Sequence, residues 1–202
     1  MKYQYLTIKM LLTISMTTAI TAIAGPFGME KGMSLDALQS LGKFSPVESK
    51  KFVYRAKTLK QGHPDFEVYS VIITPSQGLC KITAFGKDFD TSSYGLELTS
   101  KYKDIKNSLK QKYGNTSQDL DFLMAGSIWK NSNEWMMSLR QKERKLMAMW
   151  DKEKSTLNDS LSAILLQAHA VSQTKGYLTL SYEFDNSDAC LTELEASINS
   201  NL

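Results

Sequence analysis

Residues 66–85, FEVYSVIITPSQGLCKITAF, constrain the fold most, because they predict two β-strands joined by a tight turn. β-branched and aromatic residues, which pack well on a pleated surface, dominate the first half of this stretch. Pro75 and Gly78 then supply the backbone angles that a turn needs. Side chains alternate between two faces in the second half, so Cys80 is expected to point the same way as Ile82, toward the core. The stretch therefore predicts an antiparallel hairpin.

Residues 1–24 have the features of a cleaved signal peptide. Two lysines precede an apolar run at 10–23, and an A-x-A motif ends at Ala24, which makes Gly25 the first mature residue. A membrane anchor is the alternative, but the run is shorter than the ~20 residues of a spanning helix and contains five threonines and serines. No cysteine near Gly25 offers a lipid anchor, so a periplasmic or secreted protein is expected.

The charge of the mature chain argues against a nucleic-acid partner. Loss of Lys2 and Lys9 would lower the formal net charge from +3 to +1. A nearly neutral chain lacks the basic field that nucleic-acid binding requires. The mature sequence also contains no second apolar run of spanning length, so no membrane span is expected there. The sequence leaves the oligomeric state open.

Cys80 and Cys190 are the two cysteines of the chain. Export to an oxidising compartment predicts that they form a disulfide. The closed loop would hold about 110 residues, for which the chain-entropy relation gives roughly 4–5 kcal/mol of stabilisation. Two unpaired buried thiols are the alternative. Neither cysteine lies in a C-x-x-C motif, so a catalytic thiol is not expected.

Hydrophobic periodicity predicts most of the other elements. Helices are expected at 34–41, 96–113 and 120–129, and after Asp188, where Leu191, Leu194 and Ile198 give an apolar face. Strands are expected at 51–58, 161–170 and 176–184.

Residues 135–150 fit two interpretations. As a hairpin they turn at 142–144, with strands at 135–139 and 146–150. As one helix they place Trp135 and Trp150 near a common stripe. We favour the hairpin because it matches the arrangement of the first half of the chain, although intrinsic propensity favours the helix.

The elements follow the order of a helix and then strands, twice. We therefore expect an α+β fold with antiparallel sheet packed against helices. Residues 25–93 would form a first α+β unit and residues 94–202 a second one, packed together as one globular body.

Sequence motifs offer no catalytic, metal or cofactor-binding residues. His63 and His169 are the two histidines, and neither belongs to a zinc or triad motif. His63 lies in a turn and is expected at the surface, and His169 is expected in the core or on a sheet face. No glycine-rich phosphate loop is present, so no cofactor is expected.

A cluster of methionine and tryptophan residues is the best candidate for a partner surface, because methionine side chains adapt to different partners. Burial of the cluster in a core or under a covered sheet face is the alternative. Its candidate residues are Trp135, Met137, Met147, Met149 and Trp150.

Residues 32–38, GMSLDAL, followed by Leu41 and Gly42, resemble the opening of small exported α+β domains of the SmpA/OmlA/BamE type. In those domains a G-M-[ST] turn opens the first helix and a glycine closes it. The resemblance implies helices on one face of a three-stranded antiparallel sheet. Two such units in tandem resemble β-lactamase-inhibitor-type proteins, which bind other proteins and catalyse nothing. This chain departs from BamE itself in its greater length and in its lack of a lipid-anchor cysteine.

The expected function is therefore non-enzymatic: a soluble exported module that binds another envelope protein. Exposed aromatic or methionine surface on one face of the sheet would support this hypothesis. One alternative is an inhibitor or immunity protein that acts against an envelope toxin. The other is an envelope hydrolase, which would need a pocket that brings His63 or His169 within hydrogen-bond reach of a serine or carboxylate.

Overall fold

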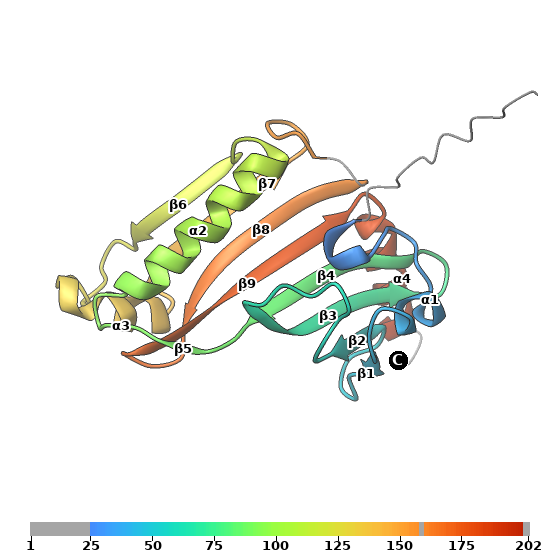
Figure 1. Cartoon of the computed structure of the whole chain (residues 1–202), viewed down its shortest axis with the longest axis horizontal. Coiled ribbons are helices and arrows are strands. Elements are labelled where there is room, and N and C mark those ends of the chain that lie inside the picture. Colours follow the sequence, from blue (N-terminus) through green and yellow to red (C-terminus); the bar gives the residue numbers. More distant parts are fainter. Residues whose placement is uncertain (1–24, 158–159, 200–202) are drawn as a thin grey trace, which may run out of the picture.

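The hairpin of residues 66–85 forms as expected and lies within one large antiparallel sheet (Figure 1). The computed structural model describes residues 25–157 and 160–199. The predicted signal peptide, residues 1–24, lies outside the described residues. Within the described residues the sheet has nine strands in the order β1-β2-β3-β4-β9-β8-β7-β6, with β5 added to β9.

The elements have the following bounds. The strands are β1 (Ser45–Pro46), β2 (Val53–Ala56), β3 (Phe66–Thr74), β4 (Gly78–Gly86), β5 (Phe89–Asp90), β6 (Gln118–Leu123), β7 (Arg144–Asp151), β8 (Leu161–Ala170) and β9 (Lys175–Phe184). The α-helices are α1 (Leu35–Gln39), α2 (Leu96–Tyr113), α3 (Trp135–Arg140) and α4 (Ser187–Asn199), and the short 3₁₀ helices are η1 (Pro26–Gly28) and η2 (Ser132–Glu134).

Pairing of β4 with β9 joins two antiparallel meanders into the single sheet. Residues 25–93 contribute β1 to β5, and residues 94–202 contribute β6 to β9. Both segments expected as separate units therefore share one hydrogen-bonded sheet. Helices and antiparallel strands together confirm the predicted α+β class.

Helix α2 covers one face of the sheet (Figure 1). It contacts β8 and β9, while α3 contacts β7 and β8. The predicted apolar stripe of α2 is buried, because its members recur at helical spacing and face the sheet. Its five buried residues are Leu98, Tyr102, Ile105, Leu109 and Tyr113.

A β-bulge corrects the expected direction of Cys80. The β3–β4 register pairs Ile72 with Lys81 but Ile73 with Leu79, so Cys80 is the extra residue. Leu79 and Ile82 belong to the hydrophobic cluster that includes the stripe of α2, whereas Cys80, which is buried as well, is bonded to Cys190 of α4. The prediction that Cys80 shares the face of Ile82 is wrong, because a bulge interrupts the alternation of side chains.

The predicted disulfide between Cys80 and Cys190 is present and ties α4 to β4. Helix α4 contacts β3 and β4 but contributes no residue to the core beneath α2, because it lies against the opposite face of the sheet (Figure 1). The apolar residues expected to bury this helix are instead largely solvent-exposed, with Leu191 at 49% and Ile198 at 53%. The disulfide and hydrogen bonds such as the one that the Ser76 hydroxyl donates to Glu193 therefore attach α4 where hydrophobic burial is incomplete.

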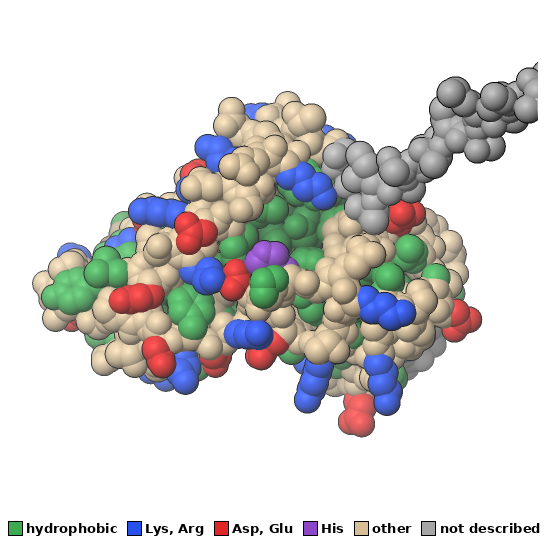
Figure 2. Space-filling model, viewed as in Figure 1, with side chains coloured by type: hydrophobic (Ala, Val, Ile, Leu, Met, Phe, Trp, Pro, Cys, Tyr) green, Lys and Arg blue, Asp and Glu red, His purple; other side chains and the backbone are tan. Residues whose placement is uncertain are grey.

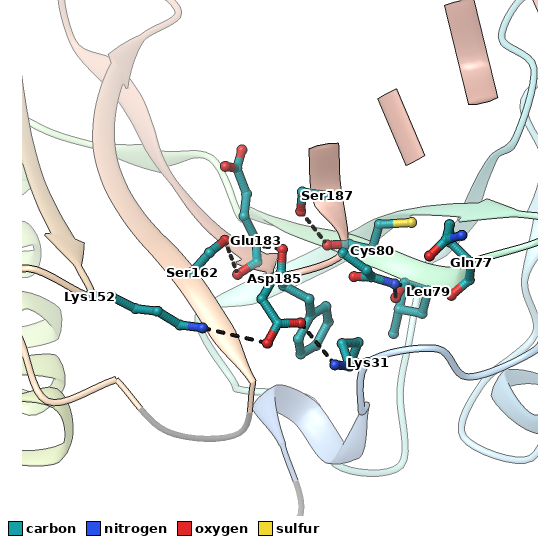
Figure 3. Close-up of polar contacts among 11 residues, drawn as sticks. Lys31, Gln77, Leu79, Cys80, Lys152, Ser162, Glu183, Asp185 and Ser187 are labelled. Carbon is teal, nitrogen blue, oxygen red and sulfur yellow. Dashed lines mark hydrogen bonds and ion pairs between the residues drawn. The ribbon is translucent and has the colours of Figure 1, made fainter. Parts of the chain in front are cut away.

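Polar contacts surround the junction between β9 and α4 (Figure 3). The amide of Asn186 donates to the backbone oxygen of Leu79 at 3.2 Å, and the hydroxyl of Ser187 donates to the backbone oxygen of Cys80 at 3.0 Å. Asp185 lies between Lys31 and Lys152. The hydrogen bond from Lys31 is the main reason why the pKa of Asp185 lies below its ordinary value.

The hairpin predicted for residues 135–150 is wrong in its first half. Residues 135–140 form α3, and only the second half is a strand, β7. A capping box between Asn131 and Glu134 starts a helical turn directly before Trp135, which favours the helix. Met136 and Leu139, three residues apart, then pack into the core.

The helix predicted at 120–129 is also wrong, because residues 118–123 form strand β6. Its backbone pairs with β7, and two ion pairs fix its acidic side chains. Asp119 pairs with Lys106 at 2.7 Å, and Asp121 pairs with Arg144 at 3.0 Å. Pairing with β7 and these two ion pairs therefore stabilise residues 118–123 as a strand.

We predict that replacing both cysteines by serine lowers the free energy of unfolding by roughly 4–5 kcal/mol, because the disulfide closes a loop with a sequence separation of 110. Denaturant unfolding with and without reductant measures the effect. Reductant should destabilise the wild type and leave the Cys80→Ser/Cys190→Ser variant unchanged. An equal response of both proteins would contradict the prediction.

We also predict that Gly95→Ala destabilises the chain more than Gly126→Ala. Both glycines have positive φ, 68° and 87°, so each alanine carries a backbone cost of about 1–2 kcal/mol. A Cβ at Gly95 would also overlap the ring of Trp135, whereas a Cβ at Gly126 meets nothing within 4 Å. The difference between the denaturant midpoints of the two variants measures the cost of crowding Trp135 of α3 at the start of α2. Equal midpoints would refute the prediction.

Candidate functional site

The face of the sheet opposite α2, here called the open face, is covered by α4 at one corner only within residues 25–157 and 160–199. Successive side chains along each strand point alternately to the core and to the open face. Five cross-strand partners form one buried row: Val71, Ile82, Tyr182, Ile164 and Trp150. The row one residue away points to the open face: Ser70, Thr83, Ser181, Leu165 and Met149.

An apolar cluster lies on the open face where β6, β7 and β8 run side by side. Its members are Leu120 and Phe122 on β6, Met147 and Met149 on β7, and Leu165 on β8. Leu120 is opposite Met147, and Leu165 is opposite Met149. Phe122 is 42% exposed, and the other four are partly exposed. We call these five residues the apolar patch.

The structure divides the five residues predicted as a partner surface. Met147 and Met149 belong to the apolar patch. Trp150 points to the opposite face and is fully buried in the core. Its indole N–H donates to the backbone oxygen of Gly114 at 3.0 Å. The other two residues, Trp135 and Met137, lie on α3.

The central part of the open face is polar. The hydroxyls of Thr83 and Ser181 are hydrogen-bonded at 3.1 Å, and Lys81 forms an ion pair with Glu183. In each pair the two side chains on neighbouring strands bond to each other. This part of the face therefore presents hydroxyl groups and a neutralised ion pair to a partner, and not an unpaired charge.

His169 was expected in the core or on a sheet face, and it lies on the open face. Its Nε2 is hydrogen-bonded to the hydroxyl of Thr179 at 2.9 Å, and its ring stacks on Tyr177 with centroids 4.9 Å apart. Burial lowers the pKa of His169, and the positive charge of Lys145 lowers it further. A neutral imidazole bonded to a threonine and an aromatic ring is a structural part of the sheet face.

A groove lies on the other face, between α2 and residues 25–27. Two cavities of about 320 and 240 Å³ share the residues Asp65, Phe66, Lys101 and Ile105. Figure 2 shows the hollow beside α2, with an apolar floor and a histidine at its rim. Leu180 and Tyr182 of β9 line its larger cavity, and burial raises the pKa of the Tyr182 hydroxyl.

His63 lines this groove, but its contacts do not match those of a catalytic base. In a Ser-His-Asp site the histidine Nδ1–H donates to the carboxylate. Here Nδ1 accepts the backbone N–H of Asp65 at 3.2 Å, and the carboxylate of Asp65 binds Lys101 at 2.8 Å. The Ser108 hydroxyl in the same groove donates to the backbone of its own helix. The described residues of the groove therefore do not pair a nucleophile with a base.

The described part of the chain has no group of three or more histidine, cysteine, aspartate and glutamate residues that could hold a metal ion. It also contains no helix with the length and apolar character needed to cross a membrane. No family model matches this chain, and neither the curated proteins nor the solved structures give a significant match.

Sequence reasoning missed three members of the apolar patch: Leu120, Phe122 and Leu165. The helix predicted at 120–129 includes Leu120 and Phe122 and does not account for their alternation with Asp119 and Asp121. That alternation is the signal of a strand with one acidic and one apolar face. Leu165 was placed in a strand, but its face follows only from the register with β7 and β9.

Proposed function

We propose that this chain is an exported, non-enzymatic module that binds another envelope protein through the open face of its sheet. The apolar patch is the observation that carries the proposal. Soluble proteins seldom leave a contiguous apolar surface uncovered unless it serves an interaction. Two of its five members are methionines, whose flexible side chains suit a protein surface better than a small rigid ligand.

The shape of the open face also favours a protein partner. The two described cavities on this face are lined by residues of β1 to β4, of β9 and of adjoining loops, and by no residue of the apolar patch. Specific protein interfaces bury about 800 Å² on each partner, with apolar residues at the centre and polar residues around them. The apolar patch next to the hydroxyl pairs of β4 and β9 follows this pattern.

Two further observations support export and a role without catalysis. The disulfide between Cys80 and Cys190 is compatible with an oxidising compartment. In the groove beside α2, the ring of His63 accepts a backbone N–H and Asp65 forms an ion pair with Lys101. An envelope hydrolase would need those groups aligned with a nucleophile.

We predict that Met147→Gln/Met149→Gln reduces capture of a partner by roughly tenfold or more, because it removes apolar surface at the interface centre without adding charge. Tagged mature protein is crosslinked in envelope extract, and captured proteins are identified by mass spectrometry. The control is Leu96→Gln, which changes a side chain that is 65% exposed on α2, on the other face of the sheet.

The control variant should capture the same protein as the wild type at the same level. All three proteins should share nearly the same thermal midpoint, since Leu96 is exposed and Met147 and Met149 are partly exposed and outside the core. Equal capture by the patch variant, or no partner with any of them, would refute the proposal.

A further inference from the structure

Three basic residues gather at the end of the open face away from the apolar patch. They are Lys43, Arg55 and Lys57, and all three are exposed. A cavity of about 540 Å³ is lined by them together with Ser45, Ala56, Thr58 and Val68. A second cavity of about 250 Å³ shares Arg55 and Val68 with it and continues toward Phe85 and Tyr177. We call the three residues the basic corner.

The charge of this depression is one-sided. Within residues 25–157 and 160–199, none of the three cations forms an ion pair. Asp88, in the second cavity, is the one carboxylate among the residues that line the two cavities. The mature chain is nearly neutral, so the local excess of positive charge is not a property of the whole surface.

Aromatic rings hold part of the basic corner in place. The guanidinium of Arg55 lies over the ring of Phe85, 5.9 Å from its centroid. Phe85 and Tyr177 line the same cavity, and Tyr177 stacks on His169. A guanidinium oriented by a ring is prepared for the two parallel hydrogen bonds that a carboxylate accepts.

One cross-strand row connects the basic corner to the apolar patch. Its members, in order, are Arg55, Ser70, Thr83, Ser181, Leu165 and Met149. Five strand spacings of about 4.8 Å place Arg55 roughly 24 Å from Met149. A protein interface of standard size covers such a distance. One partner can therefore contact both ends of the open face.

We propose that the basic corner binds an acidic segment of the protein partner, whose apolar surface contacts the patch. This inference rests on the proposed function and adds the chemistry of the partner: carboxylates about 24 Å from an apolar region. Exposed opposite charges at the rim of an interface mainly raise the rate of association and select the partner. The basic corner would therefore direct the partner onto the open face.

The test titrates the mature protein with a hexaglutamate peptide blocked at both ends, while amide NMR shifts are recorded. Shifts should be confined to the basic corner, and added salt should weaken them. Lys43→Gln/Arg55→Gln/Lys57→Gln should lower the affinity about tenfold or more. A matched variant with three exposed lysines replaced elsewhere, Lys103→Gln/Lys130→Gln/Lys154→Gln, should bind as the wild type does. Hexaglutamine should cause no shifts.

Equal affinity of the corner variant and the wild type, or shifts at other residues, would overturn the inference. So would tighter binding of citrate than of hexaglutamate, which would assign the corner to a free organic acid. In the crosslinking assay the corner variant should capture less of the partner than the matched variant does. If the corner variant captures as much partner as the matched variant, this inference is overturned and the proposed function stands. If the Met147→Gln/Met149→Gln variant captures as much partner as the wild type, the proposed function itself is refuted.

Discussion

The pairing of β4 with β9 is the interaction on which the rest of the structure depends. It joins a meander from the first half of the chain to a meander from the second half. Without this ladder, two small sheets would each have an additional open edge, which is a site of unwanted association. With it, both halves contribute to one buried row, in which Ile82 of β4 lies opposite Tyr182 of β9. The same pairing creates the continuous open face on the other side.

The two faces differ because the helices are attached in different ways. Helix α2 covers one face by burying an apolar stripe, as an amphipathic helix does. Helix α4 is attached to the other face by the disulfide and by side-chain hydrogen bonds to β4, and it leaves Leu191 and Ile198 exposed. Only one corner of that face is covered within the described residues. The uncovered remainder carries the apolar patch at one end and the basic corner at the other.

Local patterns predicted the elements whose own residues determine them. The apolar spacing of α2, the turn at Pro75 and Gly78, and the alternation in β9 all gave the observed structure. Other features depend on partners far away in the chain. The bulge at Cys80 follows from the β3–β4 register. The face that each side chain of β6 takes follows from pairing with β7 and from the ion pairs with Lys106 and Arg144.

The candidate site shows the same division. The sequence singles out Met147 and Met149 as candidates for a partner surface, and the structure places both on β7, partly exposed. The strand predicted at 146–150 already puts Trp150 on the face opposite Met147 and Met149, but which of the two faces is buried follows only from the packing of the sheet. The basic corner was not predicted, because Lys43 approaches Arg55 and Lys57 only when β1 folds back beside β2.

Oxidative footprinting of the methionines tests most directly whether the open face is a protein-binding surface. The mature protein is treated with hydrogen peroxide, with and without envelope extract, and oxidation is measured for each methionine by mass spectrometry. Met33, partly exposed near α1, is the internal reference for an accessible methionine. Met136, which is fully buried, is the reference for an inaccessible one. We predict that the extract slows the oxidation of Met147 and Met149 relative to Met33. Oxidation of all three at an unchanged ratio would contradict the account.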